Sequence, residues 1–254
     1  MIGLASAASL AGWTESGPER GHVMDVAIVD DTVYALTRIG VIRSTPELSA
    51  WTRDSRFPMN TRQIAAIPGD NAVLAITLSS VFRIGTEAVR LAFVPDGGAA
   101  VDLVAMKGGS AILAVRAANA AGSVWRIEPD GTSKAVLNDV DPWDLLADGK
   151  DIWVATLDKG VWHSSDGGLT FDNVVTTGVA SALTMLNGEV VVAWEGGRIT
   201  DHKGETLRCE VPRATVTSMT VVGETLFAVA DTDMYPFTAL YACNELGKGV
   251  RVPT

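Results

Sequence analysis

One four-residue pattern occurs four times in this chain, as Gly40-Val41-Ile42-Arg43, Ser80-Val81-Phe82-Arg83, Ser123-Val124-Trp125-Arg126 and Gly160-Val161-Trp162-His163. In each copy a small residue is followed by valine, by a large apolar residue and by arginine or histidine. The copies begin 40, 43 and 37 residues apart. A period of about 40 residues that is built from short apolar runs is typical of chains that repeat one small sheet. The sequence therefore predicts a repeat architecture.

A series of alanines, most of them in a short apolar run just before the pattern, extends the repeat to six units. The alanines are Ala35, Ala75, Ala114, Ala155, Ala193 and Ala228. Each unit reads as four short strands, and Asp148-Gly149 marks a tight hairpin in the fourth unit. We expect an all-β fold, a six-bladed β-propeller of four-stranded antiparallel blades. The blades are expected within one domain, at about residues 22–56, 62–96, 101–138, 142–176, 180–213 and 216–253.

A ring of sheets has to close, and the two ends of the chain offer strands for this. Leu10-Ala11-Gly12-Trp13-Thr14 is similar to Leu48-Ser49-Ala50-Trp51-Thr52, which is expected at the fourth strand of the first blade. We therefore expect residues 10–16 to complete the last blade, so that the N- and C-terminal segments pair and remove an exposed sheet edge. The tail Gly249-Val250-Arg251-Val252 is the alternative for the same position.

The composition is that of an ordinary globular protein, with 47% hydrophobic and 20% charged residues. The net charge of −10 repels a phosphate backbone and no basic run offsets it, so nucleic acid is not an expected partner. No apolar stretch reaches the roughly 18 residues of a membrane span. No Lys or Arg precedes Arg20 to begin a signal peptide. We expect a cytoplasmic or particle-associated protein.

The chain has two cysteines, Cys209 and Cys243, which fall in neighbouring units. Two are too few for a disulfide scaffold. We expect buried free thiols, and a single bridge is the alternative.

The most specific local motif is Ser164-Ser165-Asp166-Gly167-Gly168-Leu169-Thr170-Phe171. It resembles the Asp-box, or BNR, repeat of sialidases, sortilin-type receptors and photosystem II assembly-factor propellers. The resemblance implies a turn between a third and a fourth strand, away from the face that binds ligands. Its carboxylate can accept backbone N–H groups across the turn. The residues with this structural role are Ser164, Asp166, Gly168, Thr170 and Phe171. Weaker copies occur at residues 44–51 and 200–207, the latter with His202 in place of the aspartate.

The catalytic residues of sialidases are not recognisable in this sequence. Phe82-Arg83-Ile84-Gly85 lacks the proline of the sialidase motif and belongs to the repeat pattern. The three histidines, His22, His163 and His202, do not have the spacing of metal ligands. Residues 139–144 lack the glycine and the distal glutamate of a calcium-binding EF-hand loop, so a polar turn between blades is expected there. We predict no catalytic residue, no metal site and no cofactor.

The loops between second and third strands are the expected binding elements, because in propellers they lie on the face that usually binds. The sixth of them, residues 231–238, is the longest with aromatic content and suits a protein contact. Alternatively, its apolar side chains fold back over the mouth of the channel. The predicted binding residues are Arg38, Arg116, Asp158, Lys159, Glu195, Asp231, Asp233, Met234, Tyr235 and Phe237.

These observations favour a non-catalytic platform that binds a protein partner, or a structural subunit of a larger assembly such as an assembly factor or a virion or tail-type component. The alternative is a carbohydrate-binding or glycoside-hydrolysing propeller. A hydrolase would need carboxylates from different blades, such as Asp158, Glu195 and Asp231, to face each other about 5–10 Å apart across an open pocket near Arg38.

Overall fold

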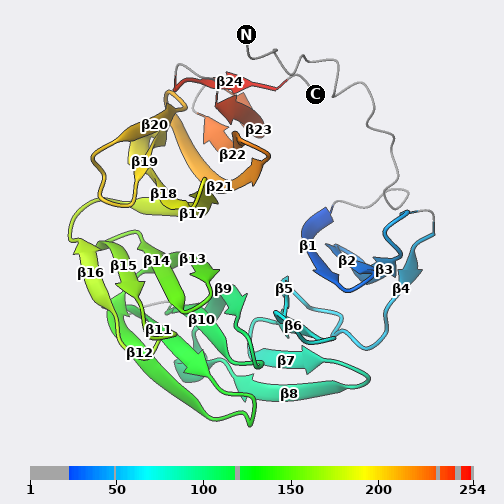
Figure 1. Cartoon of the computed structure of the whole chain (residues 1–254). Helices are drawn as coiled ribbons and strands as arrows, with labels where there is room; N and C mark the ends of the chain where they lie inside the picture. The colour runs from blue at the N-terminus through cyan, green and yellow to red at the C-terminus, as the bar shows by residue number, and fades with distance from the viewer. Residues whose placement is uncertain (1–22, 49, 118–120, 233–234, 244–246, 253–254) are drawn as a thin grey trace.

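The computed structural model describes residues 23–48, 50–117, 121–232, 235–243 and 247–252. Within them, six four-stranded sheets are arranged around a common axis (Figure 1). In every sheet the strands follow chain order and neighbouring strands pair antiparallel. The first strands of consecutive sheets contact one another and lie innermost. The expected six-bladed β-propeller is therefore confirmed.

The first three blades cover residues 23–140. Blade 1 consists of β1 (Val23–Val29), β2 (Thr32–Thr37), β3 (Gly40–Ser44) and β4 (Thr52–Arg53). Blade 2 consists of β5 (Gln63–Ala66), β6 (Val73–Ile76), β7 (Ser80–Ile84) and β8 (Ala88–Phe93). After the short 3-10 helix η2 (Pro95–Gly97), blade 3 consists of β9 (Ala99–Ala105), β10 (Ala111–Arg116), β11 (Gly122–Ile127) and β12 (Ser133–Val140).

The last three blades cover residues 142–251. Blade 4 consists of β13 (Pro142–Asp148), β14 (Asp151–Thr156), β15 (Gly160–Ser164) and β16 (Asp172–Val175). Blade 5 consists of β17 (Ala180–Leu186), β18 (Glu189–Trp194), the 3-10 helix η3 (Glu195–Gly197), β19 (Arg198–Asp201) and β20 (Leu207–Glu210). Blade 6 consists of β21 (Ala214–Val222), β22 (Thr225–Thr232), β23 (Tyr235–Cys243) and β24 (Gly249–Arg251).

The repeated four-residue pattern forms the third strands of the first four blades. Its valine is buried in every copy, where it packs into the core between blades. Its arginine instead forms an ion pair with a nearby carboxylate, and its histidine forms a hydrogen bond with one. The pairs are Arg43–Asp54, Arg83–Asp70, Arg126–Glu128 and His163–Asp151. The pattern is therefore explained by packing and by polar contacts within the blade.

The core consists of five clusters, one between each pair of consecutive blades from blade 1 to blade 6. Fully buried side chains such as Leu36, Leu74, Ile112 and Ile199 fill them. Each contributes roughly 1.5–3 kcal/mol relative to an exposed side chain. Because most second strands are covered on both faces, they read as continuous apolar runs rather than as alternating ones.

The fourth strand of blade 6 is β24, which pairs with β23. The C-terminal tail therefore takes the position that we expected residues 10–16 to fill. Residues 10–16 lie outside the described residues, and so does the expected pairing of the two chain ends.

The expectation of free thiols is wrong, because Cys209 and Cys243 form a disulfide with Cα atoms 5.8 Å apart. The bond joins β20 of blade 5 to β23 of blade 6. The same junction carries a hydrogen bond from the Glu210 N–H to the Gly247 carbonyl at 2.9 Å. The sequence placed the cysteines in neighbouring units, but the face that each strand turns toward its neighbour could not be read from the period alone.

The sixth binding loop is much shorter than expected. Strand β22 continues to Thr232 and β23 begins at Tyr235, and these two residues pair across the hairpin. Asp231, Tyr235 and Phe237 are therefore strand residues, because the pairing of β22 with β23 extends into the segment that we had read as a loop.

Candidate functional site

The antiparallel blades give the ring two faces. On the front face each first strand begins and each second strand turns into the third. On the back face lie the turns from first to second and from third to fourth strands. The loops that we predicted to bind therefore belong to the front face, and the Asp-box-like turn belongs to the back face.

A pocket of about 530 Å³ opens on the front face, among the starts of the innermost strands. Its walls come from every blade except the fifth. The lining residues are Met24, Asp25, Arg62, Gln63, Ile76, Ala100, Val101, Asp102, Trp143, Asp144, Thr217 and Ser218. We call it the central pocket. Gln63 Oε1, buried beside it, has no hydrogen-bond partner among the described residues.

Three aspartates in the wall of the central pocket tie consecutive blades together. In each, Oδ2 accepts the backbone N–H of a residue in the first strand of the following blade. The pairs are Asp25 with Ile64 at 2.8 Å, Asp102 with Leu145 at 2.6 Å and Asp144 with Leu183 at 2.6 Å. Gln63 holds the same place in blade 2, where its Nε2 donates to Asp102 Oδ1 at 2.5 Å. The hydrogen bonds of these four side chains therefore link consecutive blades.

Two of these carboxyl groups, Asp102 and Asp144, are hydrogen-bonded to each other. Burial raises the pKa of Asp102. Burial, and after it the charge of Asp102, raises the pKa of Asp144 well above its ordinary value. Two carboxyl groups in contact do not both ionise at low cost, so we describe the pair as sharing a proton. Burial also raises the pKa of Asp25.

Beside the central pocket, Arg116 and Trp143 form a surface cluster. Arg116 binds Asp141 through two hydrogen bonds, Nε–Oδ1 at 2.6 Å and Nη2–Oδ2 at 3.1 Å. Its guanidinium carbon lies 5.0 Å from the centre of the Trp143 ring. The Trp143 side chain is 36% exposed, which is high for tryptophan. We call Arg116, Asp141 and Trp143 the front cluster.

Two further predicted residues hold the same segment between blades 3 and 4. Asp158 Oδ1 accepts the backbone N–H of Asp141 at 2.9 Å, and Lys159 Nζ donates to the Asp139 carbonyl. The structure thus brings Arg116, Asp158 and Lys159 together around residues 139–143. The polar turn expected over residues 139–144 is shorter than predicted, because β12 ends at Val140 and β13 begins at Pro142, which leaves Asp141 alone between the blades.

The other predicted residues are spread along the rim of the front face. Arg38 and Glu195 are exposed in the turns after β2 and β18. Asp231 is exposed at the end of β22 and accepts a hydrogen bond from Thr238 Oγ1 at 2.6 Å. None of these three lines the central pocket. Asp233 and Met234 lie outside the described residues, as do the side chains of Tyr235 and Phe237.

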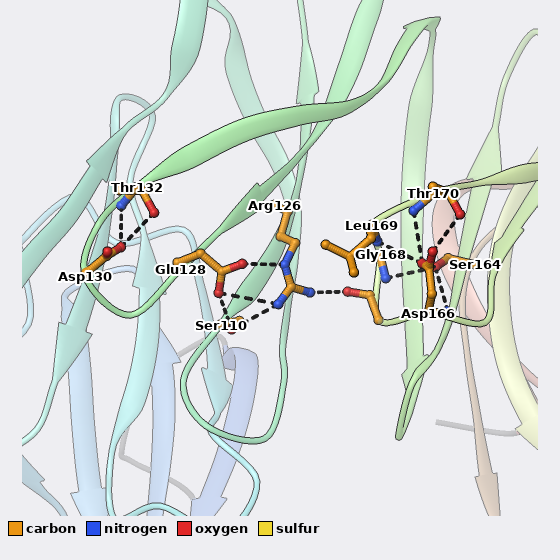
Figure 2. A network of polar contacts seen from close by, with 11 residues as sticks. Ser110, Arg126, Glu128, Asp130, Thr132, Ser164, Asp166, Gly168, Leu169 and Thr170 are labelled. Atoms are coloured by element: carbon orange, nitrogen blue, oxygen red, sulfur yellow. Dashed lines mark hydrogen bonds and ion pairs between the residues drawn. The ribbon is translucent and has the colours of Figure 1, made fainter.

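The turn at residues 164–171 lies on the back face between β15 and β16, and Figure 2 shows its hydrogen bonds. Asp166 Oδ1 accepts the N–H groups of Leu169 and Thr170 at 2.9 and 3.0 Å, and Oδ2 accepts Thr170 Oγ1 at 2.6 Å. These bonds hold the pKa of Asp166 below its usual range. Arg126 of blade 3 donates to the Gly167 carbonyl, which ties the turn to the neighbouring blade.

The weaker copy at residues 200–207 is built differently from our expectation. Asp201, one position before His202, supplies the carboxylate. It accepts the N–H groups of Lys203, Glu205 and Thr206 at 3.1, 2.9 and 3.1 Å. We had looked for the carboxylate at the position of His202, and the shift by one residue hid it.

Two of the three histidines pack beside one tryptophan on the back face. The His163 ring stacks on Trp153 with centroids 4.0 Å apart, and the His202 ring centroid lies 5.0 Å from that of Trp153. Trp153 and His202 line a pocket of about 420 Å³ between blades 4 and 5. In the part of the chain that the structure describes, no three His, Cys, Asp or Glu side chains gather as metal ligands would. The described residues also include no helix with the length and hydropathy of a membrane span.

Comparison with known proteins shows the fold. No family model and no curated protein matches the sequence. The chain is similar in structure to the GH74 xyloglucanase of Xanthomonas campestris, with TM-score 0.68, 15% identity, and coverage of 92% of this chain and 45% of that one. The chain is also similar to the structure of YCF48 bound to D1 peptide, with TM-score 0.61, 14% identity, and coverage of 84% of this chain and 75% of that one.

The extracellular domain of BT4673 from B. thetaiotaomicron gives TM-score 0.67 at 11% identity and covers 90% of this chain. This chain spans 33% of the BT4673 chain. At such identities the likeness establishes a shared β-propeller fold and leaves the activity to be argued from the site.

Sequence reasoning missed the wall of the central pocket. Asp25, Gln63, Asp102 and Asp144 recur 38, 39 and 42 residues apart, so the repeat itself carried the signal. We looked for binding residues in the loops between second and third strands. These polar residues lie instead near the starts of the first strands.

Proposed function

We propose that this chain is a non-catalytic propeller whose front face binds a protein partner, as a free-standing platform or as a subunit of a larger assembly such as an assembly factor or a virion or tail-type component. The front cluster carries the proposal. Arg116 holds the exposed Trp143 ring beside the central pocket, and Asp141 fixes the guanidinium. Tryptophan and arginine are enriched among the residues that dominate protein interfaces, and a pre-ordered pair loses little entropy on binding.

Apolar side chains on the same face support a protein partner. Ile39 is 70% exposed and Leu78 is 44% exposed, and both lie in turns between second and third strands. Large apolar groups among arginines such as Arg38 and Arg62 give the mixed character of a protein interface. A propeller of this fold, YCF48, has been observed bound to D1 peptide.

The carboxyl groups of the front face support a non-catalytic role. Asp102 and Asp144 are in hydrogen-bonding contact, whereas glycoside hydrolases hold their two carboxyl groups about 5–9.5 Å apart. Both also accept backbone N–H groups of the next blade. Asp158, Glu195 and Asp231 do not line the central pocket, so the arrangement that the carbohydrate alternative required finds no support.

Two local features bear on family and compartment. The hydrogen bonds of Asp166 support the inference that the chain is a propeller of the Asp-box type. The Cys209–Cys243 disulfide favours an oxidising compartment or an extracellular particle over a reducing cytosol.

The test compares Trp143→Ala and Arg116→Ala with Leu169→Ala, which removes a side chain that is 58% exposed on the back face. Each tagged variant is expressed in the native source, and co-purifying protein is quantified against the wild-type chain. We expect at least tenfold lower recovery with the two front-face variants and wild-type recovery with the control. Equal recovery from all three would reject the front face, and binding to a glycan array that Trp143→Ala abolishes would favour the carbohydrate alternative.

A further inference from the structure

The first strand of blade 1 has an apolar face that is exposed among the described residues. In the other blades the preceding blade covers the equivalent face. Val26 directly follows Asp25, and its side chain points away from blade 2 and is 51% exposed. At the same position the other five blades bury an apolar residue against the preceding blade. These residues are Ile64 (3% exposed), Leu103 (2%), Leu145 (6%), Leu183 (5%) and Met219 (9%). Ile28, two residues further along the same face, is 62% exposed.

Blade 6 shows the complementary feature on its opposite face. Val222 is 65% exposed, whereas Val29 and Ile67, at the same position in blades 1 and 2, are 5% and 2% exposed. The five core clusters join blades 1 to 6 in series, and among the described residues none joins blade 6 to blade 1. Figure 1 shows β1 and β21 further apart than the other neighbouring first strands. Two apolar sheet faces therefore lack their cover at this junction.

We propose that the N-terminal segment of this chain, residues 4–14, covers the β1 face at Val26 and Ile28. Residues 1–14 contain no charged side chain, and they include Leu4, Leu10 and Trp13, which can bury large apolar areas. Only residues 15–22 separate this segment from Val23, and eight residues span at most about 28 Å when extended. The segment is therefore present at a high effective concentration beside the face that it would cover.

This placement differs from pairing at the edge of blade 6. The C-terminal strand β24 already holds the fourth position there. A segment on the face of β1 instead replaces the side-chain contacts that a preceding blade supplies elsewhere in the ring. The proposal does not depend on the partner proposed for the front face, because Val26 and Ile28 lie outside the central pocket.

The direct test places a photo-cross-linking amino acid at Ile28 in the full chain. The control places it at Ile39, which is 70% exposed in the turn after β2 of the same blade. We expect cross-links from position 28 to peptides of residues 4–14, at least tenfold more abundant than from position 39. A mixture of ¹⁴N- and ¹⁵N-labelled chains should show these cross-links within one chain. Three results would overturn the proposal. Cross-links between chains would show that a second copy covers the face, and cross-links to blade 6 would show that blade 6 covers it directly. The third is the absence of any cross-link to residues 4–14.

A second measurement uses the variant Val26→Ser/Ile28→Ser, with Ile39→Ser as control. If the segment covers this face, chymotrypsin should cleave after Trp13 at least tenfold faster in the double variant than in the wild-type chain, while the control stays at the wild-type rate. Circular dichroism confirms that both variants are folded before the comparison. Equal cleavage rates in wild type and folded double variant would overturn the proposal.

Discussion

At the scale of single residues, Asp102 and Asp144 form a pair of buried carboxyl groups in contact with each other. Asp102 accepts hydrogen bonds on both oxygens, from Gln63 Nε2 on Oδ1 and from the Leu145 N–H on Oδ2. Asp144 accepts the Leu183 N–H on Oδ2, and the hydrogen bond between the two carboxyl groups favours the protonated form of Asp144 and the ionised form of Asp102. The two aspartates therefore have unequal roles, with Asp102 as acceptor and Asp144 as donor.

This asymmetry predicts different effects of two amide substitutions. In Asp144→Asn, the amide can donate to Asp102 and still accept the Leu183 N–H, so we expect little change in the free energy of unfolding at pH 5. In Asp102→Asn, the amide N–H groups meet other donors, so we expect a loss of about 1–3 kcal/mol. Urea denaturation of both variants measures the difference. An equal loss in both, or a larger loss in Asp144→Asn, would contradict the assignment.

The same pair predicts a dependence on pH. The pKa of Asp144 is raised on folding, so between the unfolded value of about 3.9 and the higher folded value the folded chain binds more protons. Its contribution to stability is therefore present at low pH and is lost as pH rises through the folded pKa. Asp144→Asn removes this loss. We expect the unfolding free energy of the variant, minus that of wild type, to increase from pH 4 to pH 8. A flat difference would mean that the pair does not share a proton.

Glycine at the start of the repeated pattern is a second residue-scale constraint. Gly160 has φ +66°, and a Cβ there would lie 2.1 Å from the Val175 carbonyl oxygen. Gly149 has nearly the same φ, +63°, but a Cβ there would meet nothing within 4 Å. Alanine at either position has to adopt the unfavourable left-handed backbone conformation. The difference between the two losses in unfolding free energy therefore measures the clash of the Cβ at position 160 with the Val175 carbonyl oxygen. We expect Gly160→Ala to cost about 1–3 kcal/mol more than Gly149→Ala in thermal or urea unfolding. Similar losses would show that the fourth strand moves aside freely.

At the scale of strands, the sequence predicted which segments pair but not which way each side chain points. The alanine series does fall in the six second strands. However, these alanines do not all face the same way. Ala35 pairs with Val26 and Ala75 with Ile64, and both face the preceding blade. Ala114 pairs with Asp102 and Ala155 with Asp144, and both face the following blade. A shift by one residue turns a strand side chain to the opposite face, and a period of 35 to 41 residues does not resolve it.

The same limit explains the missed disulfide between β20 and β23. Its removal is an element-scale prediction, because the bond closes a sequence separation of 34 residues between two blades. We expect Cys209→Ala/Cys243→Ala to lower the unfolding free energy by roughly 3–4 kcal/mol. Dithiothreitol should cause a comparable loss in the wild-type chain and none in the double variant. A wild-type chain that is as stable reduced as oxidised would contradict this role.

At the scale of the whole molecule, the six-bladed ring could be predicted because each blade repeats the same strand and turn signals. The site was harder to predict, because propeller sites are assembled from single residues of different blades. Arg116, Asp158 and Lys159 were found because they lie at or just after the ends of second strands. Trp143 was expected at the start of a first strand and was not singled out for binding. Arg116 comes from 27 positions earlier in the chain, so only folding brings the indole ring and the guanidinium together.

The division of the ring into a binding front face and an architectural back face is the central claim, and hydrogen–deuterium exchange tests it most directly. The exchange of the isolated chain is compared with that of the chain in its native complex. We expect slower exchange in the complex for residues 139–144 and 157–160, and unchanged exchange for residues 164–171. Protection confined to residues 164–171, with none around Trp143, would contradict it.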